Sequence, residues 1–251
     1  MSVTDFYDRL APMFHLVYPD WEGSVRRQAS QLDSVLRETF GDVQTILDAT
    51  CGIGTQALGL ASLGYRVTAS DLSPEAVERA KREAAKRDLA IDFHVADLRT
   101  LSSTFSTPFD VVISGDNSIP HLLSDEEILK AFREMHRCSR WGVLISVRDY
   151  DPAESSGTKL VPYGTRTDQG RRYAVFQVWE FHGPIYDVSM YFVEDDGGDS
   201  CTTHVMRTKY YAIPTARLVE LMTDAGFHDV RRIDGRFFQP LIVGKKKGTA
   251  T

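Results

Sequence analysis

Apolar positions along the chain follow two different spacings. Over the first 40 residues they recur every three to four positions, which predicts two amphipathic helices. From residue 44 onward, short apolar runs alternate with segments of helical spacing. We expect strands at 44–49, 65–70, 91–95, 109–114 and 141–148, and helices at 55–63, 74–87 and 124–138. This alternation predicts right-handed crossovers and an α/β fold with a doubly wound, mostly parallel sheet.

The pattern changes after residue 151. Three segments are rich in β-branched and aromatic residues and are separated by turn signals, so they predict an antiparallel β meander at 172–182, 185–195 and 200–212. A helix from Pro214 to Ala225 and two last strands follow. We therefore expect four parts: a helical lid (1–40), an α/β core (41–151), an antiparallel β insertion (152–212), and a helix and strands that complete the core (213–251).

Composition excludes several classes of protein. The 251 residues include 35 acidic and 29 basic side chains, and the net charge of −6 disfavours a nucleic-acid partner. No apolar run reaches the ~20 residues of a membrane helix, and the N-terminus lacks a signal-type pattern, so a cytoplasmic protein is expected. Three widely spaced cysteines predict reduced thiols and no metal site.

A glycine loop follows the first predicted strand, in "TILDATCGIGT". Its "GIGTQA" matches G-x-G-x-x-A, a pattern typical of nucleoside and dinucleotide ligands. Asp71 ends the second strand 17 residues after Gly54, where a carboxylate can accept hydrogen bonds from both ribose hydroxyls. The alternative role of Asp71 is to cap the next helix, although Ser73 can do this instead.

Three features favour S-adenosylmethionine over NAD as the ligand. Asp48 precedes the loop, where a carboxylate would repel a pyrophosphate but suits a ligand that bears an ammonium group. Asp97 ends the third strand, where it can accept from an adenine amino group. In addition, roughly 45 residues of helical pattern precede the first strand, which is enough chain to cover a small ligand.

The motifs "LDATCGIGT", "ASDLS", "ADLR", "VVISGDNSIPHLL" and "VLISVRDYD" resemble those of class I S-adenosylmethionine-dependent methyltransferases, and within that class the glycine/sarcosine N-methyltransferase family. The resemblance is specific over residues 46–151. It implies a seven-stranded Rossmann-like sheet with a reversed final hairpin. The implied cofactor contacts are Gly52, Gly54, Asp71, Asp97 and Leu98 in the core and Tyr18, Trp21 and Arg27 in the lid, to which we add Asp48, Cys51, Leu72 and Gly115.

The resemblance also implies an acceptor site at the carboxyl edge of the sheet. Asn117 matches an asparagine that faces the acceptor amine, and Arg148 matches an arginine that binds the acceptor carboxylate. The planar guanidinium group suits such a carboxylate. The alternative for Arg148 is an ion pair with Asp149 or Asp151.

Three further residues complete the predicted acceptor site. "TKYYAIP" matches a tyrosine pair of the family, so Tyr210 and Tyr211 are candidates to contact an alkylated ammonium through their rings. His121 is predicted to be a structural residue at a helix entry more than a base.

The sequence therefore predicts an enzyme that transfers a methyl group from S-adenosylmethionine to the nitrogen of a small amine or amino acid of the glycine, sarcosine or dimethylglycine type. One alternative is a natural-product O- or N-methyltransferase, which needs a base for a hydroxyl acceptor. Others are a cofactor-binding protein without catalysis and an NAD-dependent oxidoreductase. The acceptor, the number of methyl groups added and the oligomeric state stay open.

Overall fold

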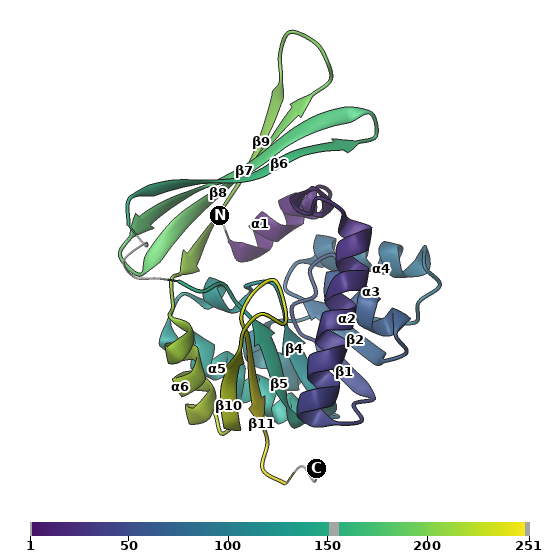
Figure 1. Ribbon diagram of the computed structural model, residues 1–251, viewed down its shortest axis with the longest axis vertical. Coiled ribbons are helices and arrows are strands. Elements are labelled where there is room, and N and C mark those ends of the chain that lie inside the picture. Colours follow the sequence, from purple (N-terminus) through teal and green to yellow (C-terminus); the bar gives the residue numbers. More distant parts are fainter. Residues whose placement is uncertain (1, 151–155, 249–251) are drawn as a thin grey trace.

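The computed structural model describes residues 2–150 and 156–248, and its central element is a seven-stranded sheet in the order β10-β11-β5-β4-β1-β2-β3 (Figure 1). Six strands are parallel and β11 runs against them, because both of its neighbours pair with it in antiparallel register. This confirms the expected fold and its reversed final hairpin. The strands are Thr45–Asp48 (β1), Arg66–Asp71 (β2), Asp92–Val95 (β3), Phe109–Ser114 (β4), Ser139–Ser146 (β5), His228–Ile233 (β10) and Leu241–Lys245 (β11).

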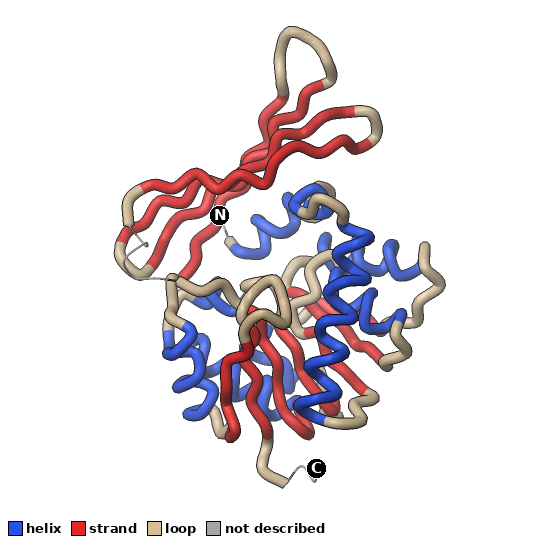
Figure 2. Tube along the Cα trace, in the orientation of Figure 1, coloured by secondary structure: helices blue, strands red, loops and turns tan. Residues whose placement is uncertain are grey.

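Helices cover both faces of this sheet (Figure 2). On one face, α2, α3 and α4 pack together, and on the other α5 and α6 do so around Phe132 and Met222. The bounds of the helices are Val3–Leu10 (α1), Trp21–Phe40 (α2), Thr55–Ser62 (α3), Pro74–Ala85 (α4), Asp125–Cys138 (α5) and Thr215–Asp224 (α6), with short 3₁₀ turns at Phe14–Val17 (η1), Leu98–Ser103 (η2) and Ile119–Leu122 (η3). None of the helices in the described ranges is both long and apolar enough to cross a membrane.

Helices α2 and α3 approach closely at Gly59. A Cβ atom at this position would lie 2.6 Å from the carbonyl oxygen of Val25 and 2.7 Å from Cβ of Ala29. Both contacts involve the body of α2, which cannot move aside as the end of a flexible side chain can. The middle of α3, the helix that follows the glycine loop, is thereby packed tightly against α2.

We expect Gly59→Ala to lower the free energy of unfolding by about 1–3 kcal/mol, since overpacking outweighs the helix propensity that alanine adds. Urea unfolding measures this difference. Gly198→Ala is the control: Gly198 lies in an exposed hairpin, and its added Cβ meets only a side-chain oxygen of Asp196. Equal stability of the two variants would contradict the close contact.

A second, four-stranded antiparallel sheet lies beyond the N-terminal helix α1, on the side away from the core (Figure 1). Its strands are Thr158–Asp168 (β6), Arg171–His182 (β7), Ile185–Asp195 (β8) and Thr202–Tyr211 (β9). The three-stranded meander predicted from the sequence is therefore incomplete, because β6 adds a strand at its edge. The inner face buries Met190 and Phe192 against Phe6 and Leu10 of α1, so α1 is held between the second sheet and the core.

Candidate functional site

The loop between β1 and α3 is shaped by two glycines in the left-handed region. Gly52 has φ 53° and Gly54 has φ 95°, a backbone conformation that residues with a Cβ atom rarely adopt. A Cβ at Gly54 would also lie 3.1 Å from the side chain of Leu58. The amide of Gly52 donates a 2.8 Å hydrogen bond to Oδ2 of Asp71, so the loop is joined to the end of β2.

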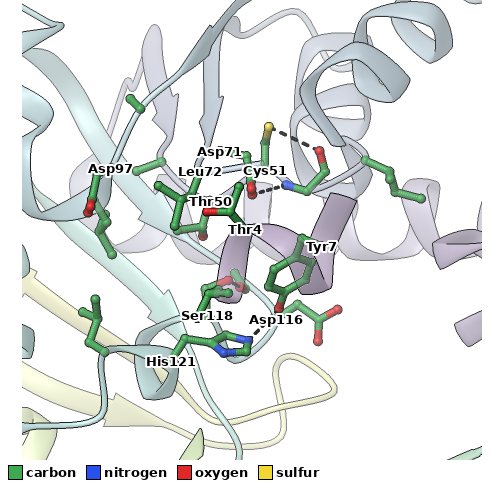
Figure 3. Close-up of a pocket in the computed structure, with 18 of the residues that line it drawn as sticks. Thr4, Tyr7, Thr50, Cys51, Asp71, Leu72, Asp97, Asp116, Ser118 and His121 are labelled. Carbon is green, nitrogen blue, oxygen red and sulfur yellow. Dashed lines mark hydrogen bonds between the residues drawn. The ribbon is translucent and has the colours of Figure 1, made fainter. Parts of the chain in front are cut away.

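A first cavity, of about 440 Å³, opens beside this loop at the carboxyl ends of the parallel strands (Figure 3). This edge of an open α/β sheet is where ligands of such folds bind. Nine residues predicted from the sequence line the cavity: Tyr18, Cys51, Gly52, Asp71, Leu72, Asp97, Leu98, Gly115 and His121. The structure therefore brings most of the expected cofactor-binding residues together.

The carboxylates of Asp71 and Asp97 lie toward one end of the first cavity. Tyr7, Asp116 and His121 lie toward the other end (Figure 3). Burial raises the pKa of Asp71, although its carboxylate accepts backbone hydrogen bonds from Gly52 and from Ser73. Burial alone would also raise the pKa of Asp97. Hydrogen bonds from Arg99 outweigh this effect, and the net result is a lowered pKa. The pairing of Asp97 with Arg99 was not among the contacts predicted from the sequence.

Asp48 is fully buried beneath the loop and does not line the cavity. Its Oδ1 accepts one long bond from the amide of Thr50, at 3.4 Å, and its Oδ2 has no partner within the described chain. Burial raises its pKa to about 7, and the charge of Asp71 adds to the shift. Asp48 is therefore a buried carboxyl group with an unsatisfied oxygen, directly under a site that we expect to take a cation.

We expect Asp48→Asn to stabilise the ligand-free protein at pH 8 by on the order of 2–4 kcal/mol and to have little effect below pH 4. The raised pKa means that the folded state binds more protons than the unfolded state between about pH 4 and 7. Stability supplied by the protonated carboxyl is therefore lost as the pH rises through this window. Urea unfolding at both pH values measures the effect.

Asp110→Asn is the matched control, with the opposite sign. Oδ2 of the buried Asp110 carboxylate accepts hydrogen bonds from the amides of Gln44 and Thr45, and Oδ1 lies 3.6 Å from Nη1 of Arg140. Asparagine removes the negative charge from these contacts, so the substitution is expected to destabilise the protein at pH 8. Stabilisation by both variants, or by neither, would contradict the assignment for Asp48.

Two predicted lid residues lie outside the first cavity. Trp21 is buried, donates from Nε1 to Oγ1 of Thr55 at 2.9 Å, and has the guanidinium groups of Arg79 and Arg87 against its ring. It thus supports Thr55, which lines the cavity. Arg27 lines a neighbouring cavity instead, so its contact with the cofactor stays a prediction. Gly54 shapes the loop without lining the first cavity.

A second cavity, of about 470 Å³, lies next to the first, beneath the antiparallel sheet. The two share Tyr7, Phe14, Tyr18 and Asp116 as lining residues. Its lining includes apolar residues of the lid, such as Leu10, and polar residues of the core, such as Arg148. Two adjoining cavities at one sheet edge suit a reaction between a cofactor and a smaller molecule.

Arg148 is the polar group that distinguishes the second cavity. Its Nη2 donates to the hydroxyl of Tyr163 at 3.3 Å, and its guanidinium lies 5.0 Å from the ring of Trp179 and 5.7 Å from that of Tyr210. Its Nη1 is buried and has no hydrogen-bond partner in the described residues. The predicted alternative of a pair with Asp149 is wrong, since Asp149 pairs with Arg232 instead. Asp151 lies outside the described residues.

Asn117 binds the protein itself. Its Oδ1 accepts from the amide of Arg148 at 2.9 Å, and its Nδ2 donates to the hydroxyl of Tyr150 at 3.1 Å. The side chain is 1% exposed and lines neither cavity. Direct contact with an acceptor amine stays a prediction, and the observed bonds show Asn117 positioning Arg148.

The predicted tyrosine pair is divided, because neighbouring residues of a strand point to opposite faces. Tyr210 lines the second cavity and lies against His121, with ring centroids 4.1 Å apart. The hydroxyl of Tyr211 donates to Asp125 of α5 at 3.0 Å, and Tyr211 lines neither cavity.

His121 lies at the other end of the first cavity, where its Nε2 is 2.8 Å from the hydroxyl of Tyr7 and its Nδ1 is 3.3 Å from that of Thr208. Burial lowers its pKa to about 3, and the charge of Arg148 adds to this effect. The imidazole is therefore neutral at physiological pH and a weak proton acceptor.

The structure adds residues that the sequence did not single out. Tyr7 and Thr4 of α1 and Gln56 of α3 line the first cavity, and Tyr163 and Gln177 of the second sheet line the second. The apolar spacing of Phe6 and Leu10 predicts α1 as a helix. It does not indicate that Tyr7, the residue after Phe6, lines a cavity.

The chain is similar to known methyltransferases. A family profile described as a methyltransferase domain matches residues 46–142, which include the glycine loop, Asp71 and Asp97. A glycine/sarcosine N-methyltransferase from Parasynechococcus marenigrum is 29% identical over 170 residues, covering 67% of this chain and 54% of that protein. Residues 46–142 match a methyltransferase domain, and these comparisons together with the fold support a class I S-adenosylmethionine-dependent methyltransferase.

Other methyltransferases are similar to this chain and differ in their acceptors. A ubiquinone biosynthesis O-methyltransferase from Methylocella silvestris is 46% identical over 69 residues, or 28% of this chain and 27% of that protein. The solved structure of an amino pentose methyltransferase from Micromonospora echinaspora matches with a TM-score of 0.77 and 16% identity, over 89% of this chain and 92% of that one. The chain thus spans about half of the length of the glycine/sarcosine N-methyltransferase and about a quarter of that of the O-methyltransferase. The solved structure supports the fold.

Proposed function

We propose that this methyltransferase transfers the methyl group of S-adenosylmethionine to the amine nitrogen of a small molecule that also bears a carboxylate. The observation that carries the proposal is Arg148, a guanidinium group held in the second cavity with a buried nitrogen that lacks a partner in the described chain. A buried charged donor left unpaired is costly, and an acceptor carboxylate would satisfy it.

The first cavity is proposed to hold the cofactor. Asp71, fixed by the amides of Gly52 and Ser73, faces the position of the ribose hydroxyls, and Asp97 that of the adenine. The methionyl part then lies toward Gly115 and Asp116, where the two cavities meet. This arrangement directs the methyl group toward the second cavity.

The reaction needs a nucleophile held close to the methyl carbon with water excluded. A neutral amine requires no base in the transfer step, which agrees with the weak basicity of His121, whose pKa is lowered to about 3. A hydroxyl acceptor would require a base that takes its proton. The site therefore favours a nitrogen acceptor.

A larger amine is the second candidate. The second cavity, at about 470 Å³, falls in the range that encloses drug-sized ligands and exceeds what glycine fills. Apolar lid residues such as Leu10 and Val17 would contact the additional carbon atoms.

The test is methyl transfer from isotopically labelled S-adenosylmethionine to a matched panel. Glycine, sarcosine, dimethylglycine and larger amino acids form one arm, and amines of equal size without a carboxylate form the other, with products identified by mass. We expect transfer only in the first arm. Equal or greater transfer to the second arm would contradict the carboxylate requirement. S-adenosylhomocysteine is measured in every reaction as the control and should be released only where a methylated product forms.

A further inference from the structure

Asp116 lies where the two cavities meet. It follows β4 and lines both the first and the second cavity, whereas Arg148 lines only the second. In Figure 3 it lies near Tyr7 and His121, away from Asp97. Because the methyl group must pass from one cavity to the other, a side chain at this boundary lies beside its path.

The backbone of Asp116 is held in an unusual conformation. Asp116 and Asn117 have φ values of 52° and 65°, in the left-handed region that residues other than glycine rarely adopt. Three bonds to β5 and its end hold them there: Asp116 N to Oγ of Ser146 at 2.8 Å, Asn117 N to O of Ser146 at 3.0 Å, and Arg148 N to Oδ1 of Asn117 at 2.9 Å. The loop thus positions Asp116 and the backbone of Arg148 as one unit.

The carboxylate is fixed from two sides by neutral donors. The hydroxyl of Tyr18 in the lid donates to Oδ2 at 2.8 Å, and Nε2 of Gln239 donates to Oδ1 at 3.2 Å. No lysine, arginine or histidine of the described residues forms an ion pair with Asp116. Since a carboxylate has about four acceptor positions, each oxygen can accept a further hydrogen bond.

We propose that Asp116 binds the acceptor nitrogen and stabilises the positive charge that develops on it, an assignment that rests on the proposed function. The acceptor leaves its proton in solvent and attacks as the neutral amine. Its lone pair forms the C–N bond while the C–S bond breaks and that electron pair remains on sulfur. The positive charge therefore moves from sulfur to nitrogen, next to a carboxylate that is already oriented.

This assignment also sets specificity. Asp116 lies at the boundary of the two cavities and Arg148 lines only the second, so an acceptor needs its nitrogen at the boundary and its carboxylate within the second cavity. A carboxylic acid without an amine would satisfy Arg148 alone.

Asp116→Asn tests the assignment, because asparagine also tolerates the left-handed conformation and keeps an oxygen for Tyr18. We expect kcat with sarcosine to fall by roughly 30-fold, from the loss of one hydrogen bond to a charged group. We expect KM to change less than threefold, because Arg148 still binds the carboxylate. S-adenosylhomocysteine should bind within threefold of the unsubstituted protein, and acetate should inhibit both equally.

Asp199→Asn, which removes an exposed carboxylate from a distant hairpin, is the control for the change in net charge. A kcat for Asp116→Asn within threefold of this control would overturn the role of Asp116 and leave the proposed function standing. If the unsubstituted protein binds S-adenosylhomocysteine but methylates none of the carboxylate-bearing amines of the panel, the proposed function is overturned together with this assignment.

Discussion

Arg148→Lys is expected to lower kcat/KM for a carboxylate-bearing acceptor by about 10²–10³-fold, mainly through a higher KM. Removing one partner of a buried charge pair costs about 2–5 kcal/mol, or roughly 30-fold to 4000-fold, and the loss expected here lies in the middle of that range. Lysine keeps the charge but has no planar fork to bind two carboxylate oxygens, and it cannot retain the contacts of the guanidinium with Trp179 and Tyr210. Initial rates over a range of acceptor concentrations separate KM from kcat.

The matched control is Arg172→Lys, in the same sheet. Arg172 is exposed and pairs with Asp195 across β7 and β8, so we expect unchanged kinetics. The affinity for S-adenosylhomocysteine should also be unchanged in Arg148→Lys, since Arg148 does not line the first cavity. Near-normal kcat/KM in Arg148→Lys would refute carboxylate binding by this residue.

The cofactor cavity could be predicted from the sequence because its determinants are local. Gly52 and Gly54 are required by the backbone conformation of one turn, and Asp71 follows at the end of the next parallel strand. Parallel strands end at the same edge of the sheet, so knowledge of the strands was sufficient to bring these residues together. The sequence motif and the observed hydrogen bond from Gly52 to Asp71 report the same constraint.

Strand β6 could not be predicted because its sequence carries two signals against a strand, Pro162 and Gly164. The structure accommodates both with a shift in register between them, in a strand that pairs on one side only. An edge strand tolerates proline because its outward amide needs no partner in the ladder. Pairing with β7 therefore makes this segment a strand, although its local sequence does not predict one.

The acceptor side could be predicted only in part because it depends on contacts distant in sequence. Sequence alone identified Arg148, but not that Asn117 would bind its amide or that Tyr163 would lie against it. The role that we propose for Asp116 depends on Tyr18 and Gln239, which lie in two segments that only the folded chain brings together.

Asp71→Asn is expected to raise the Kd for S-adenosylmethionine by about 100-fold. In our proposal the two carboxylate oxygens accept hydrogen bonds from both the loop amides and the ribose hydroxyls, and the side chain of asparagine has only one oxygen to accept them. The melting temperature of the free protein should change little. Burial makes the charge of Asp71 costly when no ligand is bound and raises its pKa, and asparagine removes that cost, but asparagine can accept only one of the two bonds that the amides of Gly52 and Ser73 donate. The substitution therefore acts mainly on the bound protein.

Thermal unfolding with and without cofactor separates these two effects. At a cofactor concentration well above both Kd values, a 100-fold weaker affinity removes about 2.7 kcal/mol of ligand-induced stabilisation. Ser73→Ala is the matched control: it removes the hydroxyl that caps α4 at Ala76 but keeps the amide that binds Asp71, so it should destabilise the free protein and change the affinity little. If Asp71→Asn instead destabilised the free protein and left cofactor affinity unchanged, the carboxylate would serve the loop alone, and the ribose would have to be bound elsewhere in the first cavity.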